Sequence, residues 1–267
     1  MPAIEAVDAA SAAARLAACV REAGALALSM FQTPLKNWTK DASSPVTEAD
    51  IAVDALLRQR LMSDGEGFGW LSEESLDDPA RLDARRVWIV DPIDGTRAYI
   101  AGFTDWAVSA ALVENGRPIA ACLFAPALDE FFSATAGGGA TLNGAPIEAT
   151  TGTTLADARI AGPKPLLDRV ATQVPPFTTM PRVRSLALRL ARVAQGSLDV
   201  ALVGGNSHDW DLAAADLLVH EAGGVLTSLQ GEPVTYNCPV PRHGTLVAAG
   251  RERHRNLIDL FRQIAPQ

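Results

Sequence analysis

The sequence is poor in cysteine and has no excess of positive charge. Its three cysteines, Cys19, Cys122 and Cys238, lie far apart and form no C-x-x-C pair, which argues against a disulfide framework and a zinc knuckle. The 267 residues include 23 Lys and Arg against 31 Asp and Glu, for a net charge of −8. Nucleic acids and anionic membranes need basic surfaces, so neither is expected as a partner. A small phosphorylated ligand is compatible with this charge, because a bound cation reverses the local sign.

The sequence also lacks a long apolar run and an N-terminal targeting segment. No stretch reaches the length of a membrane span, and the first 20 residues have no basic start and contain acidic residues. This N-terminal segment has the pattern of an amphipathic helix and not of a signal peptide. Together with the scattered cysteines, these features predict a soluble, reduced, cytoplasmic protein.

The first half of the chain changes from a helical to a strand pattern. Apolar periodicity predicts helices over residues 3–31 and 47–62, with Thr47 as the N-cap of the second helix and Asp50 three residues later. From about residue 68 to 135, short apolar runs are separated by turn-like pieces such as "VENGRP". This pattern predicts a meander of β-hairpins.

In the second half, strand-like and helix-like segments alternate. We expect strands in "ARIAG", "RVRS", "LDVAL", "VLTSL" and "TLVAAG" and helices over residues 165–174, 186–195, 211–222 and 251–264. This alternation predicts a second sheet covered by helices. The chain is therefore expected to consist of an α+β half, 1–145, and an α/β half, 146–267, with no flexible linker between them.

Acidic residues gather at the ends of these predicted elements. Asp91 ends the apolar run "VWIVD", and Asp94 follows after a proline that fixes a turn, so both carboxylates can point at one place. The other acids at element ends are Glu73 and Glu74 after "GWLS", Asp50 at a helix start, and Asp209 and Asp211 at the start of "DWDLAAADLL".

Each of these acids also has a purely structural interpretation. Asp50 can be the acidic partner of a capping box, Asp209 and Asp211 suit a helix N-terminus, and Glu73 and Glu74 can be solvated. All of them together, without a His or Cys cluster, indicate a site for Mg²⁺ or Mn²⁺ more than for Zn²⁺. Gly95 and Thr96 would then let backbone N–H groups approach a phosphate oxygen.

Four segments resemble the signature segments of the inositol monophosphatase superfamily. They are "SPVTEADIAVD", "WLSEES", "WIVDPIDGTRAYI" and "HDWDLAAADLLVHEAGG", in the same order and at similar spacing, and the resemblance covers about residues 36 to 250. It implies a layered α-β-α-β-α sandwich, with a mainly antiparallel first sheet and a second sheet flanked by helices. It also implies a Mg²⁺-dependent, lithium-sensitive phosphomonoesterase in which water attacks in line at a two-metal site.

The resemblance implies a role for each matching residue. Glu73, Asp91 and the Ile93 carbonyl would hold one ion, and Asp91, Asp94 and Asp211 would hold a second. Glu74 would stand behind these ligands or help to bind a third ion. Thr96, hydrogen-bonded to Asp50, would orient the attacking water, so the expected catalytic residues are Asp50, Glu73 and Thr96. The expected substrate contacts are Asp94, Gly95, Thr96, Ser185, Arg189 and Asp211.

Two positions depart from the inositol-specific members. Gly204 stands where those members carry a glutamate that holds a sugar hydroxyl, seven residues before Asp211. Arg189 replaces a small residue, at a position where the bacterial 3'(2'),5'-bisphosphate nucleotidase branch often has lysine; it can also be an exposed charge on a helix. A second cation favours a second phosphate, so 3'-phosphoadenosine 5'-phosphate is the expected substrate.

The alternative substrates are myo-inositol 1-phosphate, histidinol phosphate and fructose 1,6-bisphosphate. The alternative outside the enzymes is a binding protein that senses metal or phosphate with the same fold. The resemblance leaves monomer and homodimer both open, and we expect a small phosphorylated metabolite as the partner of the chain.

Overall fold

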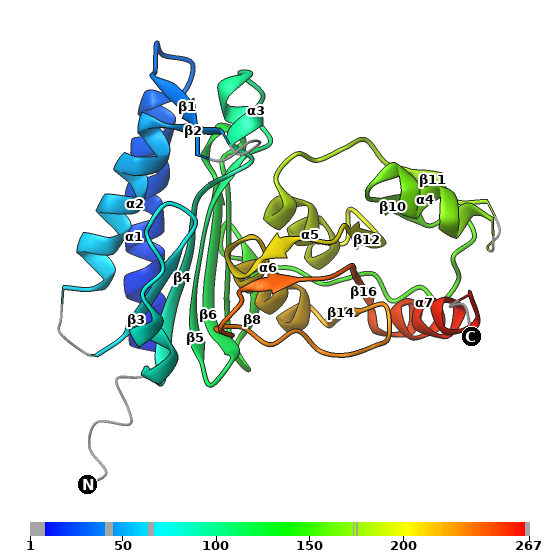
Figure 1. Cartoon of the computed structure of the whole chain (residues 1–267). Coiled ribbons are helices and arrows are strands. Elements are labelled where there is room, and N and C mark those ends of the chain that lie inside the picture. Colours follow the sequence, from blue (N-terminus) through cyan, green and yellow to red (C-terminus); the bar gives the residue numbers. More distant parts are fainter. Residues whose placement is uncertain (1–8, 41–44, 64–66, 173, 175, 265–267) are drawn as a thin grey trace, which may run out of the picture.

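Two β-sheets alternate with three layers of helices in the computed structural model (Figure 1). The structure describes residues 9–40, 45–63, 67–172, 174 and 176–264. The outer layer beside the first sheet is α1 (Ala9–Met30) and α2 (Glu48–Leu61), the middle layer is α5 (Leu186–Ala194) and α6 (Asp209–Glu221), and the outer layer beside the second sheet is α4 (Lys164–Ala171) and α7 (Arg251–Ile264). This order confirms the predicted α-β-α-β-α sandwich.

The first sheet has seven strands in the order β3-β4-β5-β6-β7-β8-β9. Every neighbouring pair is antiparallel except β3 and β4, which are parallel. The hairpin meander is therefore correct from β4 onwards and wrong for β3, because residues 73–85, with the 3₁₀ helix η1 (Pro79–Asp83), cross over between the two. The strands are β3 (Gly69–Ser72), β4 (Arg86–Asp94), β5 (Ala107–Glu114), β6 (Arg117–Ala125), β7 (Glu130–Thr135), β8 (Gly139–Leu142) and β9 (Ala145–Pro146), with η2 (Pro126–Leu128) before β7.

The second sheet has the order β11-β10-β12-β16-β14, with β10 parallel to both neighbours and β16 antiparallel to both of its own. Its strands are β10 (Arg159–Ala161), β11 (Thr178–Thr179), β12 (Val200–Val203), β14 (Gly224–Ser228) and β16 (Leu246–Gly250). The strand expected in "RVRS" is wrong. The backbone N–H groups of Arg184 and Ser185 donate to the side chain and the carbonyl of Asp105, and Ser185 becomes the N-cap of α5.

Five short elements lie outside these layers, and the sequence predicted none of them. They are the hairpin of β1 (Asn37–Thr39) and β2 (Pro45–Thr47), the pair of β13 (Ser207–His208) and β15 (Arg242–His243), and the single-turn helix α3 (Thr96–Ile100). Runs of two to five residues carry too little periodicity to be recognised.

Strand β4 is buried on both faces, which explains its continuous apolar sequence. Trp88 and Val90 pack in the cluster beneath α1 and α2, whereas Val87 and Ile89 pack with α5 and α6. The middle helices pack against both sheets, since their cluster also contains Ala201 of β12. The three cysteines are free thiols, as expected. Among the described residues, no helix combines the length and the apolar character needed to cross a membrane.

His254 on α7 gives a test of this packing. Its side chain is buried, with the residue 7% exposed, and its Nε2 lies 2.8 Å from Thr227 Oγ1. Burial lowers the pKa of the ring to about 4. An unfolded histidine titrates near pH 6.5, so the neutral ring stabilises the fold fully above about pH 6.5 and loses this effect as the pH falls towards 4.

We expect the stability difference between the wild type and His254→Gln to shrink by about 3 kcal/mol from pH 7 to pH 4. Urea unfolding of both proteins at the two pH values measures it. Taking the difference removes the contribution of all other titrating groups. A difference that does not change with pH contradicts a buried neutral ring.

Candidate active site

The parallel pairing of β3 and β4 brings two acidic residues to one edge of the first sheet. Ser72 pairs with Val90, so Glu73, the residue after β3, lies beside Asp91 of β4, and the Glu73 N–H donates to the Val90 carbonyl at 3.3 Å. The register of β4 then shifts between Asp91 and Asp94, where the chain turns into α3. This edge therefore collects carboxylates that are far apart in the sequence.

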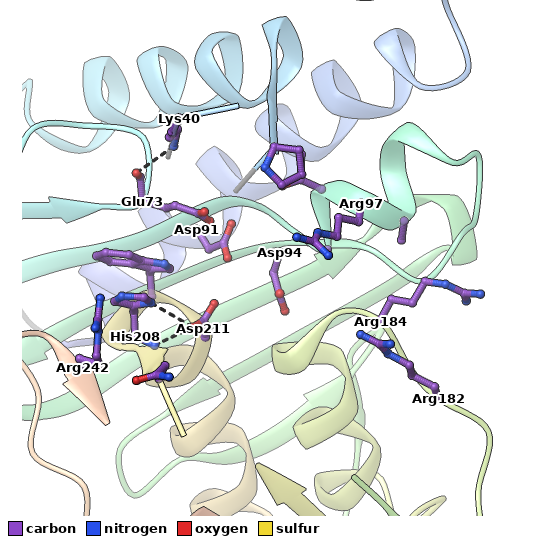
Figure 2. Close-up of a pocket in the computed structure, with 16 residues that line it drawn as sticks. Lys40, Glu73, Asp91, Asp94, Arg97, Arg182, Arg184, His208, Asp211 and Arg242 are labelled. Carbon is purple, nitrogen blue, oxygen red and sulfur yellow. Dashed lines mark hydrogen bonds and ion pairs between the residues drawn. The ribbon is translucent and has the colours of Figure 1, made fainter. Parts of the chain in front are cut away.

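Asp91, Asp94 and Asp211 form the centre of the site. One carboxylate oxygen of each lies within 4.8 Å of the other two. Asp211 reaches the cluster because α6 begins at this edge, and Figure 2 shows its carboxylate and that of Glu73 facing the same space. Asp209 points elsewhere: its Oδ1 lies 2.7 Å from His243 Nε2, and its Oδ2 accepts from the Asn237 N–H at 2.7 Å. Asp209 thus has the structural role.

The cluster is electrostatically unfavourable by itself. Burial, and then the carboxylates of Glu73 and Asp94, hold the pKa of Asp91 well above its usual range. Burial and Asp94 do the same for the pKa of Asp211. Burial and the neighbouring Glu74 raise the pKa of Glu73 to about 7. Several converging carboxylates are the donor set that Mg²⁺ prefers, and a divalent cation would offset their repulsion, so these residues fit the predicted metal.

Hydrogen bonds fix the orientation of all three aspartates, and Oδ2 of Asp211 accepts from the His208 N–H at 2.6 Å. Oδ2 of Asp94 accepts from the Ser185 hydroxyl and from the Ala187 N–H, both at 2.6 Å. Oδ1 of Asp91 accepts from the Ile93 N–H at 3.0 Å. Ser185 therefore acts in the site through Asp94, from the N-cap of α5.

Asp50 has both of the roles that the sequence left open. Its Oδ2 accepts from the N–H and the hydroxyl of Thr47, which completes the capping box of α2. Its Oδ1 lies 3.1 Å from Thr96 Oγ1, which is also 3.0 Å from the Ile93 carbonyl. Burial raises the pKa of Asp50 above its usual value. The capping box thus presents the second carboxylate oxygen to Thr96.

Glu74 lies behind the cluster and is bound by Lys40. The Lys40 ammonium contacts the Glu74 carboxylate and donates to the Glu73 carbonyl at 3.0 Å. Burial raises the pKa of Glu74 to about 7 even beside this cation. Glu74 does not line the cleft described next.

The cluster lies in a cleft of about 780 Å³ whose walls carry positive charge (Figure 2). In the part of the chain that the structure describes, Arg182 and Arg242 make no ion pair, whereas Arg184 binds Asp105. These cations could not be recognised from the sequence because they come from distant segments of the chain; the only local signal was "RVRS", which was predicted to be a strand. The basic residues that line the cleft are Lys40, Arg97, Arg182, Arg184 and Arg242.

Gly95 also lines the cleft and has a left-handed backbone, with φ of 96°. A Cβ there would lie 3.3 Å from the Asp105 carbonyl oxygen, so glycine suits both the conformation and the space. His208 and Trp210 line another part of the cleft, with their rings stacked at 4.6 Å. Burial lowers the pKa of His208.

Arg189 lies apart from this cleft. Its guanidinium donates to the Val183 carbonyl at 3.2 Å and to the Leu202 carbonyl at 3.4 Å. It lines a neighbouring cavity of about 630 Å³, which shares only Arg182 with the cleft. The side chain is half-buried, so it is not the exposed helix charge that was considered. Gly204 is likewise not among the residues that line the cleft.

Removal of one carboxylate tests whether the cluster binds metal. We expect Asp211→Asn to weaken Mg²⁺ binding by at least about tenfold, since one charged ligand is lost. Without Mg²⁺, the variant should melt at the same or a higher temperature, because the repulsion within the cluster is smaller. Calorimetric titration and thermal melting measure the two effects. Glu221→Gln, at the other end of α6, is the control; equal Mg²⁺ affinity in Asp211→Asn and wild type would contradict the metal site.

Comparison with known proteins agrees with this geometry. The chain matches the model of the inositol monophosphatase family over residues 8–265. It is 33% identical over 201 residues to the inositol-1-monophosphatase of Rhizobium meliloti, covering 72% of this chain and 75% of that protein. It is 38% identical over 207 residues to the histidinol-phosphatase of Mycobacterium tuberculosis, covering 72% and 77%.

The fold has a counterpart of similar extent among solved structures. The crystal structure of the extragenic suppressor protein suhB from Bartonella henselae superposes with a TM-score of 0.81 at 28% identity, and the match covers 93% of this chain and 97% of that one. The chain therefore belongs to the inositol monophosphatase family, which confirms the resemblance of its motifs and its assignment as a phosphoric monoester hydrolase.

Proposed function

We propose that the chain hydrolyses the phosphate ester of a small metabolite in a Mg²⁺-dependent reaction. The observation that carries this proposal is the convergence of Asp91, Asp94 and Asp211 within 4.8 Å, in a cleft that also contains Thr96. A phosphate dianion meets the positive charge of the cleft walls, and the carboxylates are suited to a cation and not to the phosphate itself. Binding a phosphate ester together with Mg²⁺ requires both the carboxylates and the basic walls of the cleft.

The residues of the chain divide the chemistry among them. Glu73, Asp91, the Ile93 carbonyl, Asp94 and Asp211 would hold Mg²⁺, which stabilises negative charge on phosphoryl oxygens and makes water more acidic. Thr96 donates its hydroxyl hydrogen to Asp50, so its lone pairs can accept a hydrogen bond from the attacking water and aim it at phosphorus. The backbone N–H groups of Gly95 and Thr96 hold the phosphate.

For the substrate, we propose a polyol monophosphate such as myo-inositol 1-phosphate, in line with the family and with the Rhizobium relative. Histidinol phosphate is the second candidate. It is favoured by the stacked rings of His208 and Trp210 in the cleft, which suit a flat imidazole, and by the absence of a polyol-binding glutamate at Gly204. The nucleotide hypothesis is less favoured, because Arg189 does not line the cleft and its guanidinium donates to the Val183 and Leu202 carbonyls.

The remaining expectations about partners and location are part of the same proposal. The acidic composition supports a small metabolite over a nucleic acid or membrane partner, and a homodimer is compatible with it. A cytoplasmic location and two or three Mg²⁺ ions, replaceable by Mn²⁺, complete the proposal.

Thr96 tests the proposed handling of water. We expect Thr96→Ala to lower kcat by about 10²-fold or more, the usual effect of losing such assistance, while KM changes little. Thr96→Ser keeps the hydroxyl and should retain most of the activity. Phosphate release under saturating Mg²⁺ measures both variants. Detection of a phosphothreonine intermediate would show instead that Thr96 is the nucleophile.

Gly204 tests the choice of substrate. A Cβ there would lie 3.4 Å from Pro163, an ordinary contact, so Gly204→Glu can be accommodated. A restored charged acceptor is worth about 1.5–3 kcal/mol for a buried hydroxyl, so kcat/KM on myo-inositol 1-phosphate should rise about tenfold or more. Activity on histidinol phosphate should not rise.

Gly205→Glu is the matched control, since a Cβ there has only Thr245 within 4 Å. Wild-type kcat/KM should be lower on 3'-phosphoadenosine 5'-phosphate than on both other substrates. A preference for the nucleotide would restore the hypothesis based on Arg189.

A further inference from the structure

Asp54 is a buried acid that none of the chemistry above uses. It lies on α2, one turn after Asp50, is 7% exposed and does not line the cleft. Both of its oxygens accept hydrogen bonds: Oδ1 from the Ser72 hydroxyl at 2.5 Å and Oδ2 from the Ser75 hydroxyl at 2.7 Å. These two serines stand immediately before and after Glu73 and Glu74.

Besides the two serines, the segment between them is held by the Glu73 N–H, which donates to the Val90 carbonyl, and by Lys40, which contacts the Glu73 carbonyl and the Glu74 carboxylate. Residues 73–78 belong to neither a helix nor a strand. Within the segment, the Ser72 hydroxyl accepts from the Glu74 N–H at 3.3 Å, and the Ser75 hydroxyl accepts from Trp70 Nε1 at 3.2 Å. Both serine hydroxyls therefore accept one bond from the segment or its strand and donate the other to Asp54.

Only a carboxylate can satisfy both serines in this arrangement. Each hydroxyl has a single hydrogen and gives it to Asp54, so position 54 must supply two acceptors. Asparagine has one acceptor and an NH₂ group, which would face a serine oxygen that already accepts from a neighbouring donor. One buried hydroxyl would then lose its acceptor, at a cost of the order of a lost hydrogen bond.

We propose that Asp54 is a positioning residue that fixes the turn of Ser72–Ser75, so that the Glu73 carboxylate faces Asp91, and thereby sets the affinity of the site for Mg²⁺. Asp50 and Asp54 are four residues apart and lie on one face of α2. The same rigid helix thus holds Thr96 through Asp50 and the Glu73 turn through Asp54. This inference rests on the proposed metal-dependent function.

The test separates metal affinity from chemistry and from stability. We expect Asp54→Ala to raise the Mg²⁺ concentration for half-maximal activity by about tenfold or more, as for other residues that orient metal ligands. At saturating Mg²⁺, kcat should recover to within about threefold of wild type. The rise in melting temperature caused by Mg²⁺ alone, without substrate, should need correspondingly more Mg²⁺.

Three further variants keep the test decisive. Ser75→Ala removes one of the two bonds and covers the case in which Asp54→Ala does not fold; it should shift the Mg²⁺ requirement in the same direction. Ser75→Thr keeps the hydroxyl and should have the Mg²⁺ requirement of the wild type. Asp199→Asn is the matched control, because Asp199 is equally buried at 7% but binds Thr150 and Arg159 in the second half; it should lower stability and leave the Mg²⁺ requirement unchanged.

The outcomes distinguish this inference from the proposed function. An unchanged Mg²⁺ requirement in both Asp54→Ala and Ser75→Ala would overturn the inference and leave the phosphatase proposal intact. A shift as large in Asp199→Asn would also overturn it, since general destabilisation would then explain the effect. A wild-type protein that binds Mg²⁺ but releases no phosphate would refute the proposed function, and the thermal measurement would still test Asp54.

Discussion

The repulsion among buried carboxylates is the constraint on which the rest of this structure depends. Asp91, Asp94 and Asp211 converge within 4.8 Å, and burial holds the pKa values of Asp91 and Asp211 far above the ordinary range. Left to itself, such a cluster would separate or bind protons. The cluster persists because each carboxylate belongs to a helix or strand that is held in place by the apolar cores on both faces of the first sheet.

The layered architecture supplies these attachments from three directions. Strand β4, buried on both faces, carries Asp91 and Asp94 to the sheet edge, and the parallel β3 brings Glu73 beside them. Helix α6 belongs to the middle layer and brings Asp211 from the second half of the chain. Helix α2 covers the other face and contributes Asp50 and Asp54. A shift of any one of these layers would separate the carboxylates, so the geometry of the site depends on the packing of the whole fold.

The distribution of charge around the cleft explains how an acidic protein can bind a phosphorylated ligand. The net charge is −8, yet the cleft is lined by Arg182 and Arg242, which have no ion-pair partner among the described residues, as well as by Lys40. Acids at the centre suit a cation, and the surrounding basic residues suit an anion. The acidic centre would therefore bind a metal ion, and the basic walls would bind the phosphate beside it.

Local patterns in the sequence predicted most of the long helices and strands, and the resemblance of its motifs to a known family implied the layers and the acidic residues of the site. Long periodic helices such as α7 and the buried run of β4 are visible in the residue order, and the motifs around Asp91 and Asp211 identify the family. The parallel pairing of β3 and the true edge strand β11 could not be predicted, since backbone partners are chosen by packing between distant segments. For the same reason only the tertiary structure placed the basic residues around the cleft, turned Arg189 towards the Val183 and Leu202 carbonyls, and bound Asp54 to both serines that flank Glu73.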